Sequence, residues 1–285
     1  MANNRDLPDY KLLFSIAYNF LGSVSEAEDI VQDVWLIWIE KGEQSIENPR
    51  SYLCKTLTNK CIDRLKELKK AREFYQGTWL PEPWVMDKDV SVGFEPLANS
   101  LMLLLEKLNP LERAVYLLRE VFDFSYEDIG WILNKSEENC RQLLRRARQQ
   151  VKGRKRYRAS AEDIGKFMNL FAEAAEKGSF QPLIERLKED AILYSDGGGK
   201  VPAALKPLPG ASIIGKFLNG ITQLAPSEMT FRFGLVNGNP GIVGFSEGKP
   251  VTVFSIEIDE NRQISRIFIT RNPDKMQKLW ATNLI

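Results

Sequence analysis

The chain has 285 residues, of which 44% are hydrophobic and 27% charged, so it can build two or three soluble domains. Its net charge is only +1, and it has no histidine, which excludes imidazole bases, Ser–His and Cys–His nucleophiles and the commonest metal ligand. It shows no membrane-spanning run and no signal peptide, and its three cysteines fit neither a disulfide framework nor a zinc site. We therefore expect a cytoplasmic protein with buried thiols and without a cofactor or metal, which is not an enzyme.

Residues 8–73 are predicted to be helical. Ser25 and Glu28 have the spacing of a capping box, and apolar residues recur at helical spacing after them. Asn48 and Pro49 have the pattern of an N-cap followed by a first-turn proline, which predicts the start of another helix.

These two helices have faces of different charge. The first has an acidic side, consisting of Glu26, Asp29, Asp33 and Glu40 with Gln32 nearby. Because these acids would repel DNA, a basic protein surface is the expected partner. The second has a mostly basic face, consisting of Lys55, Asn59, Lys60, Asp63, Lys66 and Lys70. That face is either simply solvated or a surface for phosphates and unpaired bases.

Residues 74–99 contain three prolines and no sustained periodicity, which predicts a linker. Its tryptophans, Trp79 and Trp84, indicate that this linker packs on another part of the chain.

Residues 100–152 are predicted to form a second helical unit with a helix-turn-helix. Ser125 precedes a short helix, Asn134 is suited to a left-handed turn, and Ser136 caps the next helix. The second helix has one apolar side, formed by Cys140, Leu143, Leu144, Ala147 and Val151. The opposite side is polar, with Glu138, Gln142, Arg145 and Gln149 flanked by Arg141 and Arg146.

This polar side suits the major groove of DNA, because arginine and glutamine can make paired hydrogen bonds with a base edge. The basic residues of 152–158 would contact phosphates. A solvated surface helix is the alternative interpretation.

The rest of the chain has the pattern of an α+β domain. The predicted elements are a helix ending at Gly178, a partly helical stretch at 181–188, a strand at 190–195, a helix at 211–223 and then an antiparallel sheet with hairpins.

Two stretches resemble a known family. SEAEDIVQDVWLIW followed by NPRSYLCKTLTNKCIDRLKELKK resembles region two of extracytoplasmic-function sigma factors, and LNPLERAVYLLREVFDFSYEDIGWILNKSEENCRQLLRRAR resembles region four. The resemblance implies an alternative sigma factor that binds core RNA polymerase and directs promoter-specific initiation. It implies that Asp29, Gln32 and Asp33 bind core polymerase. It implies contacts with the minus-ten element by Asn59, Lys60, Asp63 and Lys66, and with the minus-thirty-five element by Glu138, Asn139, Arg141, Gln142, Arg145 and Arg146.

The last part of the chain resembles a SnoaL-like domain, the cone-shaped α+β fold of polyketide cyclases and ketosteroid isomerases. One sigma subgroup carries this domain together with three short motifs, and all three are present. They are Trp79-Leu80-Pro81-Glu82-Pro83, Asp196-Gly197-Gly198-Gly199-Lys200 and Asn272-Pro273-Asp274-Lys275. The resemblance implies that the fused domain contacts the linker and regulates the sigma half in cis. Judged by residue type alone, the two later motifs are ordinary loop sequences.

The expected domains are therefore region two at 1–73, the linker at 74–99, region four at 100–158 and the SnoaL-like domain at 159–285. The alternative is a helix-turn-helix protein fused to a SnoaL-like enzyme or sensor of an unknown small molecule. Glu257 and Asp259 are expected to lie outside the cone, because the inward residues of their strand are Thr252, Phe254, Ile256 and Ile258. The acidic helix at Asp29 and Asp33 favours the sigma factor.

Overall fold

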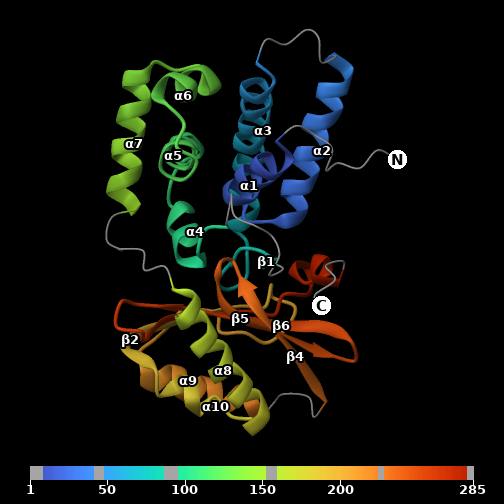
Figure 1. The fold of residues 1–285 in the computed structure, drawn as a ribbon, viewed down its shortest axis with the longest axis vertical. Helices are drawn as coiled ribbons and strands as arrows, with labels where there is room; N and C mark the ends of the chain where they lie inside the picture. The colour runs from blue at the N-terminus through green and yellow to red at the C-terminus, as the bar shows by residue number, and fades with distance from the viewer. Residues whose placement is uncertain (1–8, 42–47, 87–95, 152–158, 224–227, 281–285) are drawn as a thin grey trace. The chain divides into compact units, whose positions relative to one another are not determined.

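The computed structural model describes residues 9–41, 48–86, 96–151, 159–223 and 228–280. The chain divides into two compact units (Figure 1). Unit 1 comprises residues 1–74, 92–97 and 101–153, and unit 2 comprises residues 75–91, 98–100 and 154–285. Most of the expected linker thus belongs to the same unit as the C-terminal part of the chain.

The first half of unit 1 contains three helices, α1 (Tyr10–Leu21), α2 (Val24–Lys41) and α3 (Pro49–Arg72). Asn48 accepts a hydrogen bond from the amide of Ser51 and caps α3, as predicted. The capping box predicted at Ser25 is wrong, because α2 begins at Val24 and the hydroxyl of Ser23 accepts the amide of Glu26. The apolar sides of the three helices form one core that also buries Cys54 and Cys61.

The second half of unit 1 contains α4 (Asn99–Leu105, whose first two residues belong to unit 2), α5 (Pro110–Tyr116), the π-helical turn η3 (Leu117–Val121), α6 (Tyr126–Leu133) and α7 (Glu137–Val151). Ser125 caps α6, Asn134 has a left-handed φ of 53°, and Ser136 accepts the amide of Asn139. The predicted helix-turn-helix is therefore confirmed.

A buried ionic network joins the two halves of unit 1. Glu106 lies 2.5 Å from Arg72 at the end of α3 and 2.5 Å from Arg113 of α5. Burial alone would raise the pKa of Glu106, but the attraction of Arg113 and Arg72 outweighs it and lowers that pKa. Arg113 is fully buried and also donates to the carbonyl of Asn19. Removing one partner would leave a buried charge uncompensated.

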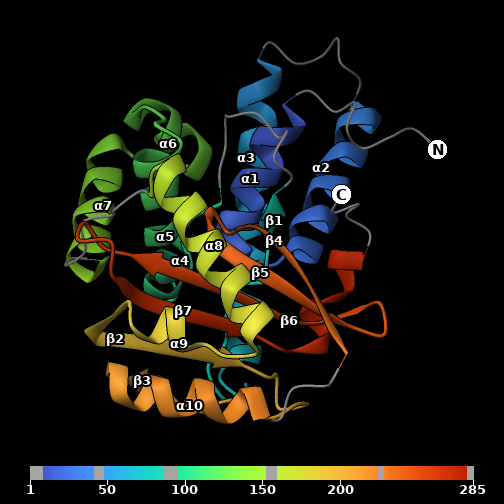
Figure 2. The same ribbon diagram turned by 60° about the horizontal axis from the view of Figure 1, so that its bottom comes forward.

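Unit 2 contains α8 (Ala161–Lys177), α9 (Gln181–Ile184), α10 (Ala211–Gln223) and a seven-stranded sheet (Figure 2). The strands are β1 (Val85–Met86), β2 (Leu187–Asp196), β3 (Leu208–Pro209), β4 (Met229–Val236), β5 (Asn239–Ser246), β6 (Lys249–Ile258) and β7 (Ile264–Thr270), in the order β1-β4-β5-β6-β7-β2-β3. The β4-to-β7 meander is antiparallel as predicted, whereas β2 pairs with β7 in parallel.

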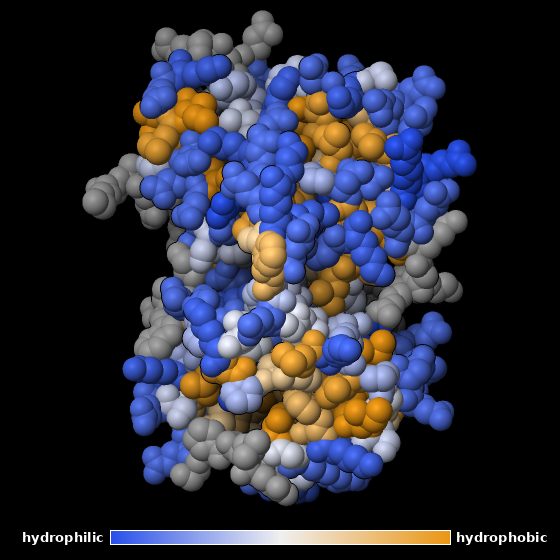
Figure 3. Space-filling model, turned by 180° about the vertical axis from the view of Figure 1, so that it is seen from behind, coloured by the Kyte–Doolittle hydropathy of each residue, from blue (hydrophilic) through white to orange (hydrophobic). Residues whose placement is uncertain are grey.

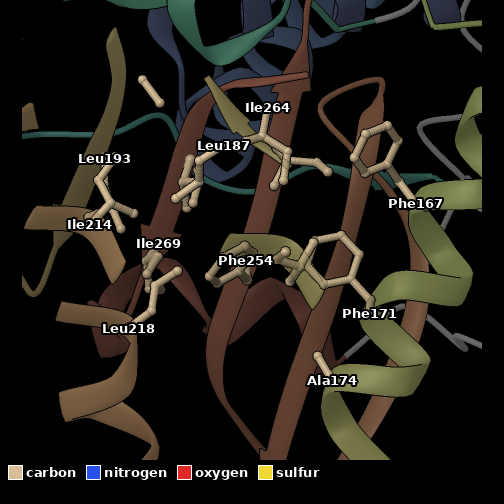
Figure 4. Packing of buried hydrophobic residues seen from close by; sticks show 14 of the residues in the cluster. Phe167, Phe171, Ala174, Leu187, Leu193, Ile214, Leu218, Phe254, Ile264 and Ile269 are labelled. Carbon is tan, nitrogen blue, oxygen red and sulfur yellow. The ribbon is translucent and has the colours of Figure 1, made fainter. Parts of the chain in front are cut away.

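The two faces of this sheet have separate apolar cores. One core lies between the sheet and the helices, where side chains of α8, α10 and the strands point toward one another (Figure 4). The other contains Val85 of the linker, residues of β4 to β6, and Met276 and Leu279 near the C-terminus. Met276 directly follows the short helix η4 (Pro273–Lys275), and Leu279 lies in the short helix η5 (Gln277–Trp280). The linker thus supplies both an edge strand and part of a core.

Within the described ranges, no helix has the length and apolar character needed to cross a bilayer.

Candidate functional surfaces

The expected polymerase-binding residues lie on the exposed side of α2. Asp29, Gln32 and Asp33 are all exposed. Glu26, expected on the same acidic side, instead pairs with Arg64 of α3 through two contacts of 2.5 and 2.7 Å. Apolar side chains also reach the surface of the molecule in several groups (Figure 3). The large exposed ones among the described residues are Leu36, Ile39, Phe74, Trp131, Leu205, Ile213 and Phe233.

Leu36 and Ile39 continue the row of exposed residues on α2, because three- and four-residue steps keep to one side of a helix. They are 51% and 57% exposed. The exposed side of α2 therefore combines acidic residues with two large apolar side chains.

The expected minus-ten residues lie along α3. Asn59, Asp63 and Lys66 are exposed, and Asp63 lies 2.7 Å from Lys66. Lys60 is half-buried, with its Nζ 2.9 Å from the carboxylate of Asp33. The faces expected to contact polymerase and DNA are thus joined by an ion pair.

Part of α3 contacts α6 of the helix-turn-helix within unit 1. The ammonium of Lys55 lies over the ring of Trp131, 4.1 Å from its centroid. The side-chain amide of Asn59 donates to the backbone carbonyl of Lys55 at 2.9 Å and to that of Ile132 at 3.4 Å. In this arrangement two polar residues of the α3 face are engaged by the helix-turn-helix.

All six expected minus-thirty-five residues are exposed on α7, namely Glu138, Asn139, Arg141, Gln142, Arg145 and Arg146. Arg141 pairs with Glu137 at 2.6 Å and lies over the ring of Tyr126. The opposite side of α7 buries Cys140, Leu143, Leu144 and Ala147, as the periodicity predicts. The phosphate contacts expected at 152–158 lie outside the described residues.

The turn before α7 depends on a glycine that the sequence analysis did not single out. A Cβ atom on Gly130 would lie 2.7 Å from the backbone carbonyl oxygen of Lys135. Only a residue without a side chain allows the two segments of the helix-turn-helix to approach this closely.

In unit 2 the three short motifs meet at the carboxylate of Asp196. One oxygen of this buried residue accepts the amide of Leu80 at 2.9 Å and lies 2.6 Å from Nζ of Lys275. The other oxygen accepts the hydroxyl of Tyr75 at 2.6 Å and the amide of Gly198 at 2.9 Å. We call these contacts, together with Asn272, the linker anchor.

Further contacts complete the linker anchor. Lys275 donates to the carbonyl of Leu80, and its ammonium lies 4.6 Å from the centroid of the Trp79 ring. Asn272 donates to the hydroxyl of Tyr75 at 2.9 Å. Burial, reinforced by the hydrogen bond to Asp196, raises the pKa of Tyr75, so this hydroxyl stays protonated and continues to donate.

The remaining motif residues have different surroundings. Leu80, Pro81, Glu82 and Pro83 are buried, so this stretch packs within unit 2 and is not an exposed tether. Gly198 has a φ of 62°, and a side chain there would collide with Asn272. Lys200 and Asp274 pair with each other at 2.7 Å on the exposed side of the motifs.

Comparisons with known proteins identify two sigma-factor regions in the chain. Residues 9–71 match the model "Sigma-70 region 2", and residues 98–151 match "Sigma-70, region 4". The chain is 29% identical to the ECF RNA polymerase sigma factor SigJ of Mycobacterium tuberculosis, over 92% of this chain and 89% of the relative. The crystal structure of that factor matches with a TM-score of 0.71, covering 93% of this chain and 94% of the other. The chain is an extracytoplasmic-function sigma factor. It is also 25% identical to the probable ECF sigma factor SigI of the same species, over 94% of this chain and 92% of the relative.

The predicted fold class is therefore confirmed, with two helical sigma domains followed by a SnoaL-like α+β domain. As an alternative sigma factor, the protein binds core RNA polymerase and promoter DNA and directs the initiation of transcription.

The interior of the SnoaL-like part of this sigma factor is occupied by its own side chains. Phe254 of β6 packs against Phe171 of α8 and stacks on Phe180, with ring centroids 5.4 and 5.3 Å apart (Figure 4). Glu257 lies on the opposite side of β6, where it is 3.2 Å from Arg266. Asp259 accepts amides within the following turn. Both acids lie outside the helix-covered core, as predicted.

Several residues that hold the linker lie outside the three sequence motifs. Tyr75 lies in the linker just before the first motif and binds Asp196, whereas Asn237 and Glu257 lie in no motif and bind Trp84 and Ser100. Their partners are 121 to 157 residues away along the chain, so no local pattern indicates these contacts.

Proposed function

We propose that the SnoaL-like domain regulates this sigma factor in cis by holding the linker at Asp196. The linker anchor supports this proposal, because one buried carboxylate joins residues from all three motifs. In Asp196 and Lys275 the ionised side chains are 0% and 11% exposed, so their hydrogen bonds are protected from water. A charge-assisted bond in such surroundings is among the stronger ones that a protein makes.

Holding the linker matters because it connects the two promoter-reading domains. We propose the boundaries 1–73 for region two, 74–99 for the linker, 100–158 for region four and 159–285 for the SnoaL-like domain. A flexible chain as long as this linker would have a root-mean-square length of roughly 25–30 Å. The anchored chain samples far fewer arrangements. The two domains can therefore match fewer distances between the minus-ten and minus-thirty-five elements.

We further propose which residues contact polymerase and DNA. Asp29, Gln32 and Asp33 contact core polymerase, and Leu36 and Ile39 supply the apolar centre that protein interfaces need. The minus-ten element is contacted by Asn59, Lys60, Asp63 and Lys66. The minus-thirty-five element is contacted by Glu138, Asn139, Arg141, Gln142, Arg145 and Arg146.

The SnoaL-like domain acts through this docking and not through catalysis. Support comes from the aromatic packing around Phe254 and from the place of Glu257 on the other face of the sheet. Because core polymerase and the chromosome of a bacterium lie in the cytoplasm, we place the protein there.

The experiment is run-off transcription from one cognate promoter with Asp196→Asn, and Asp274→Asn as the matched control. Both changes remove one carboxylate charge from a motif, but Asp274 is 56% exposed and pairs with the exposed Lys200. Exposed pairs contribute about 0–1 kcal/mol, whereas breaking a buried pair costs about 3–5 kcal/mol. Asp196→Asn should therefore change transcript yield while core binding persists, and Asp274→Asn should change the yield much less. Equal transcript from both variants and the wild type would refute regulation through the linker.

A further inference from the structure

A second set of contacts holds the far end of the linker in unit 2, away from the three motifs. The amide of Ser100 donates to Oε1 of Glu257 at 2.9 Å. The side-chain amide of Asn99 donates to the hydroxyl of Ser255 at 3.3 Å, and its oxygen accepts from Asn237 at 2.5 Å. We call these contacts the second anchor.

Asn237 connects this end of the linker with an earlier part of it. Its side-chain oxygen accepts the amide of Trp84 at 2.7 Å, while its own backbone amide donates to the carbonyl of Trp84 at 3.0 Å. Its side-chain nitrogen binds Asn99 at the same time. The buried side chain of Asn237 therefore binds both Trp84 and Asn99, which are 15 residues apart in the linker.

The chemistry of Asn237, Glu257 and Ser100 suits the hydrogen bonds that they make in the second anchor. Asn237 has a φ of 49° in the turn between β4 and β5, a conformation that asparagine tolerates better than most residues. An amide side chain offers both a donor and an acceptor, which a carboxylate or a hydroxyl cannot offer in the same geometry. Glu257 is buried, and Arg266 compensates its charge. Ser100 lies in the first turn of α4, where a backbone amide has no partner within the helix.

We infer that Asn237, Ser255 and Glu257 are positioning residues that fix where region four begins, and that they thereby narrow the promoter spacings this sigma factor accepts. The inference rests on the proposed regulation by the SnoaL-like domain and adds a second contact point to it. The linker anchor holds the linker near Leu80, and the second anchor holds Asn99, its last residue, and Ser100, the first residue of region four. Without the second anchor, Asn99 and Ser100 would lose their hydrogen bonds to unit 2, and the start of region four could shift. One base-pair step is about 3.4 Å, so such freedom would span several spacings.

The test uses the full chain with Glu257→Ala and Asn237→Gly, since glycine preserves the left-handed turn at position 237. Glu260→Ala is the control, because it removes the same charge from an exposed position in the turn after β6. Glu257→Gln is a milder variant that retains an acceptor oxygen. Hydrogen exchange is measured on peptides covering residues 97–105, with residues 187–196 as the folding reference. Transcription is measured on a promoter series with the spacer shortened or lengthened by single base pairs.

We expect exchange at Ser100 to rise about tenfold in Glu257→Ala, as for the loss of one charge-assisted hydrogen bond. The preference for one spacer length should fall by a similar factor in Glu257→Ala and Asn237→Gly, and less in Glu257→Gln. Unchanged exchange, or an unchanged spacer profile in variants that keep the reference protected, would overturn the inference. Asp196→Asn separates the two proposals: if it still changes transcription, only the second anchor has failed. If it has no effect either, the proposed regulation has failed as well.

Discussion

The ammonium of Lys60 lies 2.9 Å from the carboxylate of Asp33. This ion pair joins α2, whose exposed side we assign to core polymerase, to α3, whose exposed side we assign to DNA. Both partners are partly exposed, at 33% and 53%, so the pair itself adds little stability. The pair shows that the surface assigned to core polymerase and the surface assigned to DNA adjoin each other.

The first prediction concerns core binding by α2. Asp29→Lys should weaken association with core polymerase, because it inverts the charge that meets a basic partner surface. Asp33→Lys should do the same and should also repel Lys60. Asp190→Lys is the control, since Asp190 is 77% exposed on β2. A binding titration in which Asp29→Lys and the control match the wild type would remove the α2 assignment.

The second prediction concerns base reading by α7. Arg145→Ala or Gln142→Ala should each weaken promoter binding by about 1–3 kcal/mol and relax the preference at one upstream position. Lys152, which lies outside the described residues, should behave differently as a phosphate contact. Lys152→Ala should weaken all sequences alike and reduce the salt dependence. Identical profiles for both kinds of variant across a set of mutated promoters would contradict this division.

The third prediction compares two glycines in helices. Gly130→Ala places a Cβ atom 2.7 Å from a backbone oxygen, so it should lower the free energy of unfolding by about 1–3 kcal/mol. Gly165→Ala in α8 has open space around the new methyl group and should raise that free energy by about 0.5–1 kcal/mol. Urea unfolding measures both. A destabilisation at Gly165 equal to that at Gly130 would show that close approach is not the cause.

The fourth prediction concerns acid stability in unit 1. Arg113 and Arg72 lower the pKa of Glu106, so its ionised form is stabilised by folding. That contribution is present above the ordinary value of 4.5 and is lost as the pH falls through the lowered folded value. Glu106→Gln should destabilise the protein by about 3–5 kcal/mol near neutrality and flatten the acid limb of the stability curve. An acid limb as steep in the variant as in the wild type would assign the acid sensitivity to other carboxylates.

Local patterns predicted most of the secondary structure. The caps at Asn48, Ser125 and Ser136 follow from short-range hydrogen bonding, and alternation along β4 to β7 indicated the meander. Two serines near residue 24 both fit a cap, which is why the start of α2 was predicted two residues late.

Other features leave no local signal in the sequence. The strands β1 and β3 have two residues each, too few to show a periodicity. The parallel pairing of β2 with β7 joins segments about 75 residues apart, and the contact between Glu257 and Ser100 is also non-local. Resemblance identified the three motifs, but only the structure shows that they meet at Asp196.

We propose that contact between the linker and the SnoaL-like domain controls transcription. The most direct measurement is a double-mutant cycle on transcript yield with Tyr75→Phe and Asp196→Asn, whose side chains meet at 2.6 Å across that contact. If docking through this contact acts on transcription, the effects of the two changes should not add, and the coupling should be about 0.5–3 kcal/mol. Additive effects, or no effect of either change, would contradict the account.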